Sequence, residues 1–207
     1  MGKVLIGCYN KSVILTYIGA MCSILGMFYV EKLSFAMICL MLAGVCDLFD
    51  GKIARMCKRT EQEKEFGIQI DSLVDVVSSV VFPVVILSEA CSNFLDNPFS
   101  VMGILTIVGA GIYLLAGVIR LGWFNITTDG HTSYYRGLPV TSISIILPLV
   151  YLIFSKFAYF EYIFILTYYI VGFLFVFNMK VKKLTGIWYG IFSALAIIFT
   201  VVFFVCF

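Results

Sequence analysis

Four aspartates stand at helical spacings within largely apolar stretches of this sequence. Asp47 and Asp50 lie three residues apart, and Asp71 and Asp75 lie four residues apart. Residues at either spacing share one face of a helix, so each pair is expected to present both carboxylates on the same side. Only a short polar segment separates the pairs, which favours two antiparallel neighbouring helices. We therefore predict that all four carboxylates converge on one cavity.

Isolated carboxylates are unstable in apolar surroundings, and this limits the chemistry that the four aspartates can serve. A charged side chain near the centre of a bilayer costs about 2.5–3.5 kcal/mol on insertion scales. Neighbouring carboxylates also repel one another, so bound cations are their expected partners. Oxygen ligands without histidine or cysteine favour hard ions such as Mg²⁺, Mn²⁺ or Ca²⁺. Two such ions would balance four charges and keep coordination positions open for a phosphate group.

Histidine and cysteine do not offer a second kind of metal site. His131 is the only histidine, and the seven cysteines are scattered without a C-x-x-C pair. Cysteines in or beside apolar runs are expected to be buried free thiols.

Small and basic residues accompany the first aspartate pair. Gly51 and Ala54 lack bulk, which would let a ligand approach the helix backbone. The guanidinium of Arg55 is suited to a diphosphate. The acids of the connecting loop are interpreted differently, as solvated charges beside lysines and arginines: Glu61, Glu63 and Glu65. The pattern as a whole indicates a two-metal, phosphate-handling site, with a cation transporter as the alternative from another class.

The rest of the chain is suited to hold this site in a membrane. Of 207 residues, 62% are hydrophobic and 13% are charged, against about 25% charged in a typical soluble domain. Continuous apolar runs indicate helices rather than a barrel, which needs alternating positions. We predict an all-α, polytopic transmembrane bundle with residues 1–207 as a single domain, a retained first span, and about seven spans (six to eight): 13–30, 33–54, 67–90, 99–122, 138–156, 158–178 and 184–206.

The basic residues predict an orientation for these spans. If the N-terminus is cytoplasmic and each span crosses once, twelve of the fourteen lysines and arginines face the cytoplasm. Only Lys32 and Lys156 face the other side. Because cytoplasmic loops are enriched in basic residues, this arrangement places the aspartates at the cytoplasmic face of an integral membrane protein.

Eight residues of this region match a family signature, D-x2-D-G-x2-A-R followed by G-x3-D-x3-D. They are Asp47, Asp50, Gly51, Ala54, Arg55, Gly67, Asp71 and Asp75. In these residues the chain resembles the CDP-alcohol phosphotransferases, also called the class I CDP-alcohol phosphatidyltransferases. Eleven residues separate Arg55 from Gly67, against a usual eight, and the extra residues fall in the connecting loop, where Thr60 is a candidate for a hydroxyl contact to a diphosphate.

The resemblance implies transfer of a phosphatidyl group from CDP-diacylglycerol to an alcohol, with release of CMP. By this analogy the four aspartates hold two Mg²⁺ or Mn²⁺ ions, and Asp75 is also the general base for the acceptor hydroxyl. The remaining signature residues would line the CDP-diacylglycerol site: Gly51, Ala54, Arg55 and Gly67. The implied partners are this nucleotide lipid, membrane lipids and a second copy of the chain as a homodimer, but no nucleic acid.

Two further segments resemble those of the phosphatidylserine synthases in this family, which implies L-serine as the acceptor. Residues 71–78 match D-S-L-x-D-x-V-S, and residues 120–142 contain R-L-G-W-F-N followed by R-G-L-P, with Trp123 in place of a second arginine. Serine needs a cation for its carboxylate and oxygen atoms for its ammonium group. The candidates are Arg120, Asn125, Arg136, Thr141 and Ser142. Inositol phosphate or glycerol phosphate would also need arginines and remain alternatives, and the two hydroxyl residues are equally candidates for a helix cap.

Overall fold

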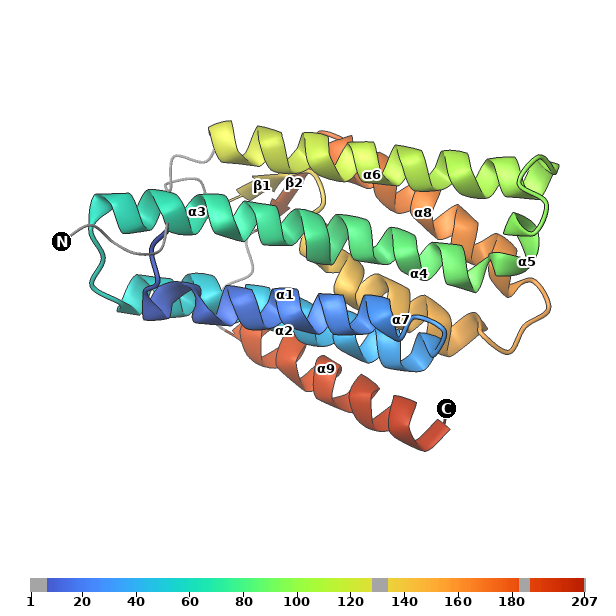
Figure 1. Cartoon of the computed structure of the whole chain (residues 1–207), viewed down its shortest axis with the longest axis horizontal. Coiled ribbons are helices and arrows are strands. Elements are labelled where there is room, and N and C mark those ends of the chain that lie inside the picture. The colour runs from blue at the N-terminus through green and yellow to red at the C-terminus, as the bar shows by residue number, and fades with distance from the viewer. Residues whose placement is uncertain (1–6, 128–133, 183–186, 207) are drawn as a thin grey trace.

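A computed structural model of the chain describes residues 7–127, 134–182 and 187–206, with a few side chains in these ranges not described. The described residues form a bundle of helices with two short strands near one end (Figure 1). In chain order the elements are η1 (Lys11–Val13), α1 (Ile14–Phe28), α2 (Leu33–Met56), α3 (Glu61–Asp75), η2 (Val76–Val81), α4 (Phe82–Ala90), α5 (Ser92–Leu95), α6 (Val101–Thr127), β1 (Tyr134–Arg136), η3 (Val140–Ser142), α7 (Ile143–Phe154), α8 (Phe160–Val176), β2 (Lys180–Lys182) and α9 (Ile187–Cys206).

The predicted all-α membrane bundle is confirmed. Three helices are long and apolar enough to cross a bilayer: Leu33–Met56, Glu61–Ala90 and Val101–Thr127. Shorter apolar helices accompany them in the described part of the chain: Ile14–Phe28, Val140–Phe154, Phe160–Val176 and Ala194–Phe203. Each of the seven apolar stretches expected from the sequence thus contains a helix. How many of these helices cross the membrane, and in which direction, stays a prediction.

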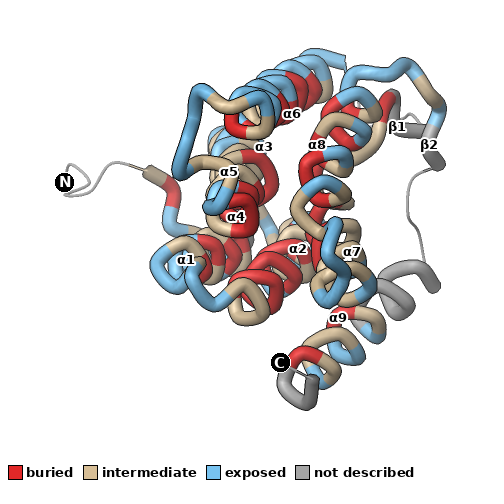
Figure 2. Tube along the Cα trace, turned by 90° about the vertical axis from the view of Figure 1, so that its right-hand side faces the viewer, coloured by how far each residue is buried: buried red, intermediate tan, exposed pale blue. Residues whose placement is uncertain are grey.

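The surface of the bundle is apolar, as a membrane protein requires. Buried residues face the inside of the bundle and exposed residues its periphery (Figure 2). Large apolar side chains remain exposed on the outer faces, such as Leu115 at 61% and Phe173 at 58%. Inside, the fully buried side chains include Met37, Phe82 and Tyr113. Because hydrocarbon solvates apolar side chains, this outer surface is suited to lipid.

One continuous helical segment, α3–η2–α4, changes its hydrogen-bonding pattern directly after Asp75. Residues Val76–Val81 form a π-helical turn, and Pro83 follows it in α4. A proline has no N–H for the carbonyl four residues earlier, which here belongs to Ser79. The hydroxyl of Tyr113 in α6 donates to that carbonyl at 2.6 Å. The helix therefore passes a proline inside the apolar bundle without an unsatisfied oxygen at that position.

The segment between α6 and α7 is tied to the end of α8. Strands β1 and β2 pair antiparallel, with Tyr135 opposite Val181. Gly137 follows β1 with φ +77°, and a Cβ there would lie 2.5 Å from the carbonyl oxygen of Phe175. Its N–H donates to the carbonyl of Met179 at 2.9 Å. Only glycine combines this conformation with this contact, so the G-L-P segment has a structural reason in addition to its family resemblance.

Candidate active site

The two aspartate pairs converge from neighbouring helices at one end of the bundle. Asp47 and Asp50 lie in the last turns of α2, and Asp71 lies in α3. Single carboxylate oxygens of these three residues lie within 4.8 Å of one another. Asp75 is not part of this group, but it shares two cavities with it. The structure therefore brings together the four carboxylates that the sequence singled out.

These carboxylates fit a divalent cation. Three negative charges within a few ångströms repel strongly, and an apolar bundle screens them less than water does. Their donor set consists of oxygen atoms, which suits Mg²⁺ or Mn²⁺. Asp47, Asp50 and Asp71 are the described residues that would hold such an ion together.

Thr16 of α1 is a site residue that the sequence did not reveal. Its hydroxyl donates to Oδ2 of Asp50 at 2.7 Å, and both side chains are buried. Hydroxyls in apolar helices often bond to their own helix backbone, so a single threonine in such a run carries no signal of this role. The contact brings a third helix to the carboxylate group.

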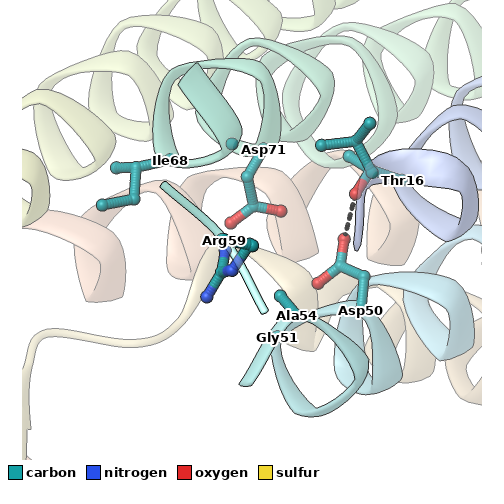
Figure 3. A pocket seen from close by; sticks show the side chains of 9 residues that line it. Thr16, Asp50, Gly51, Ala54, Arg59, Ile68 and Asp71 are labelled. Atoms are coloured by element: carbon teal, nitrogen blue, oxygen red, sulfur yellow. Dashed lines mark hydrogen bonds between the residues drawn. The ribbon is translucent and has the colours of Figure 1, made fainter. Parts of the chain in front are cut away.

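A first cavity, of about 170 Å³, opens on one side of the carboxylates (Figure 3). Asp50 and Asp71 line it, and small residues of α2 and α3 form part of its wall: Gly51, Ala54 and Gly67. A Cβ added at Gly51 would meet no other atom within 4 Å. The protein's own packing thus does not require glycine at this position, whereas a ligand lying against the helix backbone would.

Arg59 also lines the first cavity, which sequence reasoning missed because it treated this residue as a solvated loop charge. Arg55, expected there, lines a second cavity instead, and its Nε donates to the carbonyl of Gly51 at 3.0 Å. The hydroxyl of Thr60 is used by the cap of α3: it accepts from the N–H of Glu63 and donates to the Glu63 carboxylate. The loop conformation, which the sequence pattern does not specify, turns Arg59 toward the first cavity.

The second cavity, of about 220 Å³, opens on the other side of the same carboxylates. Besides Asp47 and Asp75 it is lined by Arg55, Arg120 and Thr141. Arg120 is only 7% exposed. Its Nε donates to the carbonyl of Leu138 at 3.1 Å, and its guanidinium carbon lies 5.0 Å from the centre of the Phe124 ring. These contacts hold a positive charge beside the carboxylates.

The other candidates for acceptor binding are placed differently. Asn125 is exposed, and its amide donates to the Ser72 hydroxyl at 2.8 Å, joining α6 to α3. The hydroxyl of Ser142 donates to the carbonyl of Pro139 at 2.7 Å and so serves its own turn. The side chain of Arg136 lies outside the described residues. Of the five candidates, the structure places Arg120 and Thr141 at the cavity.

A bundle of long apolar helices with a carboxylate cluster beside two cavities is the architecture of an integral membrane protein with a polar site among its helices. The sequence model of the CDP-alcohol phosphatidyltransferase family matches residues 10–202, and the chain belongs to this family. The family resemblance inferred from the aspartate signature is thereby confirmed.

Individual relatives have modest identity to this chain. It is 28% identical over 140 residues to a CDP-diacylglycerol–serine O-phosphatidyltransferase of Helicobacter pylori, covering 66% of this chain and 55% of the relative. It is 32% identical over 133 residues to the protein of that name from Saccharomyces cerevisiae, covering 59% and 42%. An archaetidylserine synthase of Methanothermobacter thermautotrophicus is 32% identical over 109 residues, covering 53% and 42%. The chain thus spans about half the length of the curated relatives it matches.

Proposed function

We propose that this chain is a CDP-diacylglycerol–serine O-phosphatidyltransferase, which transfers a phosphatidyl group from CDP-diacylglycerol to L-serine. The observation that carries the proposal is the position of the carboxylates between two cavities. Asp50 and Asp71 belong to the walls of both. A donor in one cavity and an acceptor in the other would meet at these residues. The names of three relatives, each referring to a serine product or substrate, support this choice of acceptor.

The first cavity is suited to the diphosphate of the donor. Its glycine and alanine wall lets a ligand lie against the backbone of α2 and α3. The carboxylates would hold Mg²⁺ or Mn²⁺, which would supply charge withdrawal from the phosphate oxygens and stabilisation of the leaving CMP. Asp47, Asp50 and Asp71 are the ligands proposed for this ion, and a second ion would also engage Asp75.

The second cavity is suited to the acceptor. Asp75 lines it together with Asp47, and we assign to Asp75 the role of general base. The serine hydroxyl oxygen would form a bond to the phosphorus of the phosphatidyl group while the phosphorus–oxygen bond to CMP breaks. The hydroxyl proton passes to the Asp75 carboxylate. Arg120 would pair with the serine carboxylate, and the hydroxyl of Thr141 would accept from its ammonium group.

Two alternative functions would use the same residues. Inositol phosphate or glycerol phosphate in the second cavity would place a phosphate against Arg55 and Arg120. A cation transporter would need a polar path through the bundle beyond the carboxylates. The cytoplasmic orientation of the site and a homodimer remain predictions of the charge pattern and the family resemblance.

An acceptor panel tests the proposal. Membranes that contain the chain are given CDP-diacylglycerol, Mn²⁺ or Mg²⁺, and one acceptor at a time: L-serine, inositol phosphate or glycerol 3-phosphate. We expect CMP release with L-serine only. Release with a phosphorylated acceptor and not with serine would exclude the serine assignment. Metal-dependent cation flux into liposomes without any CMP release would favour a transporter.

A further inference from the structure

The side chain of Arg59 points into the first cavity from the short loop of residues 57–60. Because α3 already begins at Glu61, most of the segment expected as a lengthened loop is helical. Arg59 lies between α2 and α3, immediately before Thr60, the N-cap of α3. Figure 3 shows its guanidinium group inside the cavity that Asp71 and Ala54 also line. The neighbouring Lys58 is exposed. The loop thus directs one of two adjacent cations into the site and the other to solvent.

The guanidinium of Arg59 contains an unsatisfied hydrogen-bond donor. Its Nε is buried and has no hydrogen-bond partner in the structure. Leaving a buried charged donor unsatisfied is unfavourable, because the group loses its water without gaining an acceptor. Arg59 lines the cavity together with Asp50 and Asp71, yet it forms no ion pair with either. Neither carboxylate neutralises its charge, which therefore remains available to an anion in the cavity.

The surroundings of Arg59 hold it in this place. A capping box fixes the next residue: the Thr60 N–H donates to the Glu63 carboxylate at 2.8 Å, and the Glu63 N–H donates to the Thr60 hydroxyl at 3.3 Å. On the cavity side, Nη1 of Arg59 lies 3.7 Å from the position of a Cβ at Gly67. A longer side chain at position 67 would extend toward the guanidinium. The signature glycine thus leaves room for an arginine that the signature does not include.

We propose that Arg59 binds a phosphate group of the nucleotide diphosphate in the first cavity, an inference that rests on the proposed function. A guanidinium matches phosphate oxygens through paired N–H donors. Because the guanidinium of Arg59 lies in the cavity that Asp50 and Asp71 also line, a nucleotide phosphate is a better partner for it than a lipid headgroup in the surrounding membrane. Arg59 then binds the donor substrate CDP-diacylglycerol, although it lies outside the family signature. It lines the first cavity, whereas Arg55 lines the second.

Nucleotide and metal binding together test this assignment. The full chain in detergent micelles is titrated with Mn²⁺ alone and then, at saturating Mn²⁺, with CDP. Arg59→Gln should weaken CDP binding roughly ten- to a hundredfold, as expected for lost hydrogen bonds to a charged group. Its Mn²⁺ affinity should stay within about twofold, because Arg59 forms no ion pair with the aspartates. Arg59→Lys, which keeps the charge, should recover part of the affinity, and Lys58→Gln is the matched control and should bind CDP normally.

Each other outcome contradicts the assignment in a recognisable way. Unchanged CDP affinity in Arg59→Gln would show that this residue does not contact the nucleotide. Loss of Mn²⁺ and CDP binding together would show that Arg59 acts through the carboxylates or the fold. If Lys58→Gln weakens CDP binding as much as Arg59→Gln, the loss of affinity reflects the overall positive charge of the loop rather than a contact made by Arg59. Failure of the unmodified chain to bind CDP at all would contradict the proposed function itself.

Discussion

The hydroxyl of Thr16 donates a 2.7 Å hydrogen bond to Oδ2 of Asp50 and thereby connects α1 to the carboxylate cluster between α2 and α3. The bond leaves the other oxygen of Asp50 for a second partner. It also limits the rotation of a carboxylate that lines both cavities. Residues that orient a metal ligand in this way affect metal affinity although they do not touch the ion.

Replacing Thr16 should therefore weaken metal binding. Thr16→Val keeps the shape of the side chain but removes the donor to Asp50. We expect Mn²⁺ affinity to fall about tenfold, within the range seen for such supporting residues. Titration of the purified chain with Mn²⁺ measures this, with Thr16→Ser as the control that retains the hydroxyl. Equal affinities of Thr16→Val and the unmodified chain would mean that the hydrogen bond does not orient the ligand.

Loss of the Asp75 carboxylate should abolish activity without abolishing metal binding. Asp75→Asn removes the proposed proton acceptor while keeping the size of the side chain. We expect CMP release from CDP-diacylglycerol and serine to fall at least a hundredfold, because general base catalysis commonly contributes about 10²–10⁴-fold. Mn²⁺ should still bind through the other three carboxylates, whereas Asp50→Asn should reduce Mn²⁺ affinity directly. Retained turnover in Asp75→Asn would remove this residue from the role of base.

Gly137 should tolerate no side chain. Its φ is +77°, and a Cβ would lie 2.5 Å from the carbonyl oxygen of Phe175. Gly137→Ala is expected to destabilise the fold by about 1–3 kcal/mol, the usual penalty of a strained backbone, with further loss from the contact. Gly111→Ala in α6 is the control, since a Cβ there meets nothing within 4 Å. Thermal unfolding in detergent should show a lower midpoint for the first variant only.

Tyr113 should stabilise the helix that Pro83 interrupts. Tyr113→Phe leaves the Ser79 carbonyl without the hydroxyl that now donates to it at 2.6 Å. A buried acceptor left unsatisfied costs about 1–3 kcal/mol. Tyr169→Phe is the matched control, because the hydroxyl of Tyr169 donates to the Leu105 carbonyl in an exposed setting. If both variants unfold at the same temperature, the bond to Ser79 is no more important than a surface contact.

Much of the fold was predictable because its determinants are local. Apolar runs long enough to span a bilayer specify helices whatever lies beside them, and the seven expected stretches each contain one. The break between α7 and α8 falls at residues 155–159, at the predicted boundary between the spans 138–156 and 158–178. The π-helical turn after Asp75 was not foreseen. Within it, the hydroxyl of Tyr113 donates to the Ser79 carbonyl, a contact between residues far apart in the chain.

The same distinction between local determinants and contacts between distant residues applies to the candidate site. The sequence by itself was sufficient to identify the four aspartates as a site. Helical spacing places each pair on one face, and charged residues in an apolar chain are usually functional. Only the tertiary structure decided how other side chains surround them: Thr16 on Asp50, Arg120 beside the second cavity, and Arg55 and Arg59 on opposite sides. The physical reason is that helical periodicity is set by neighbouring residues. The direction of a loop side chain is set instead by caps and packing between segments that the sequence does not place together.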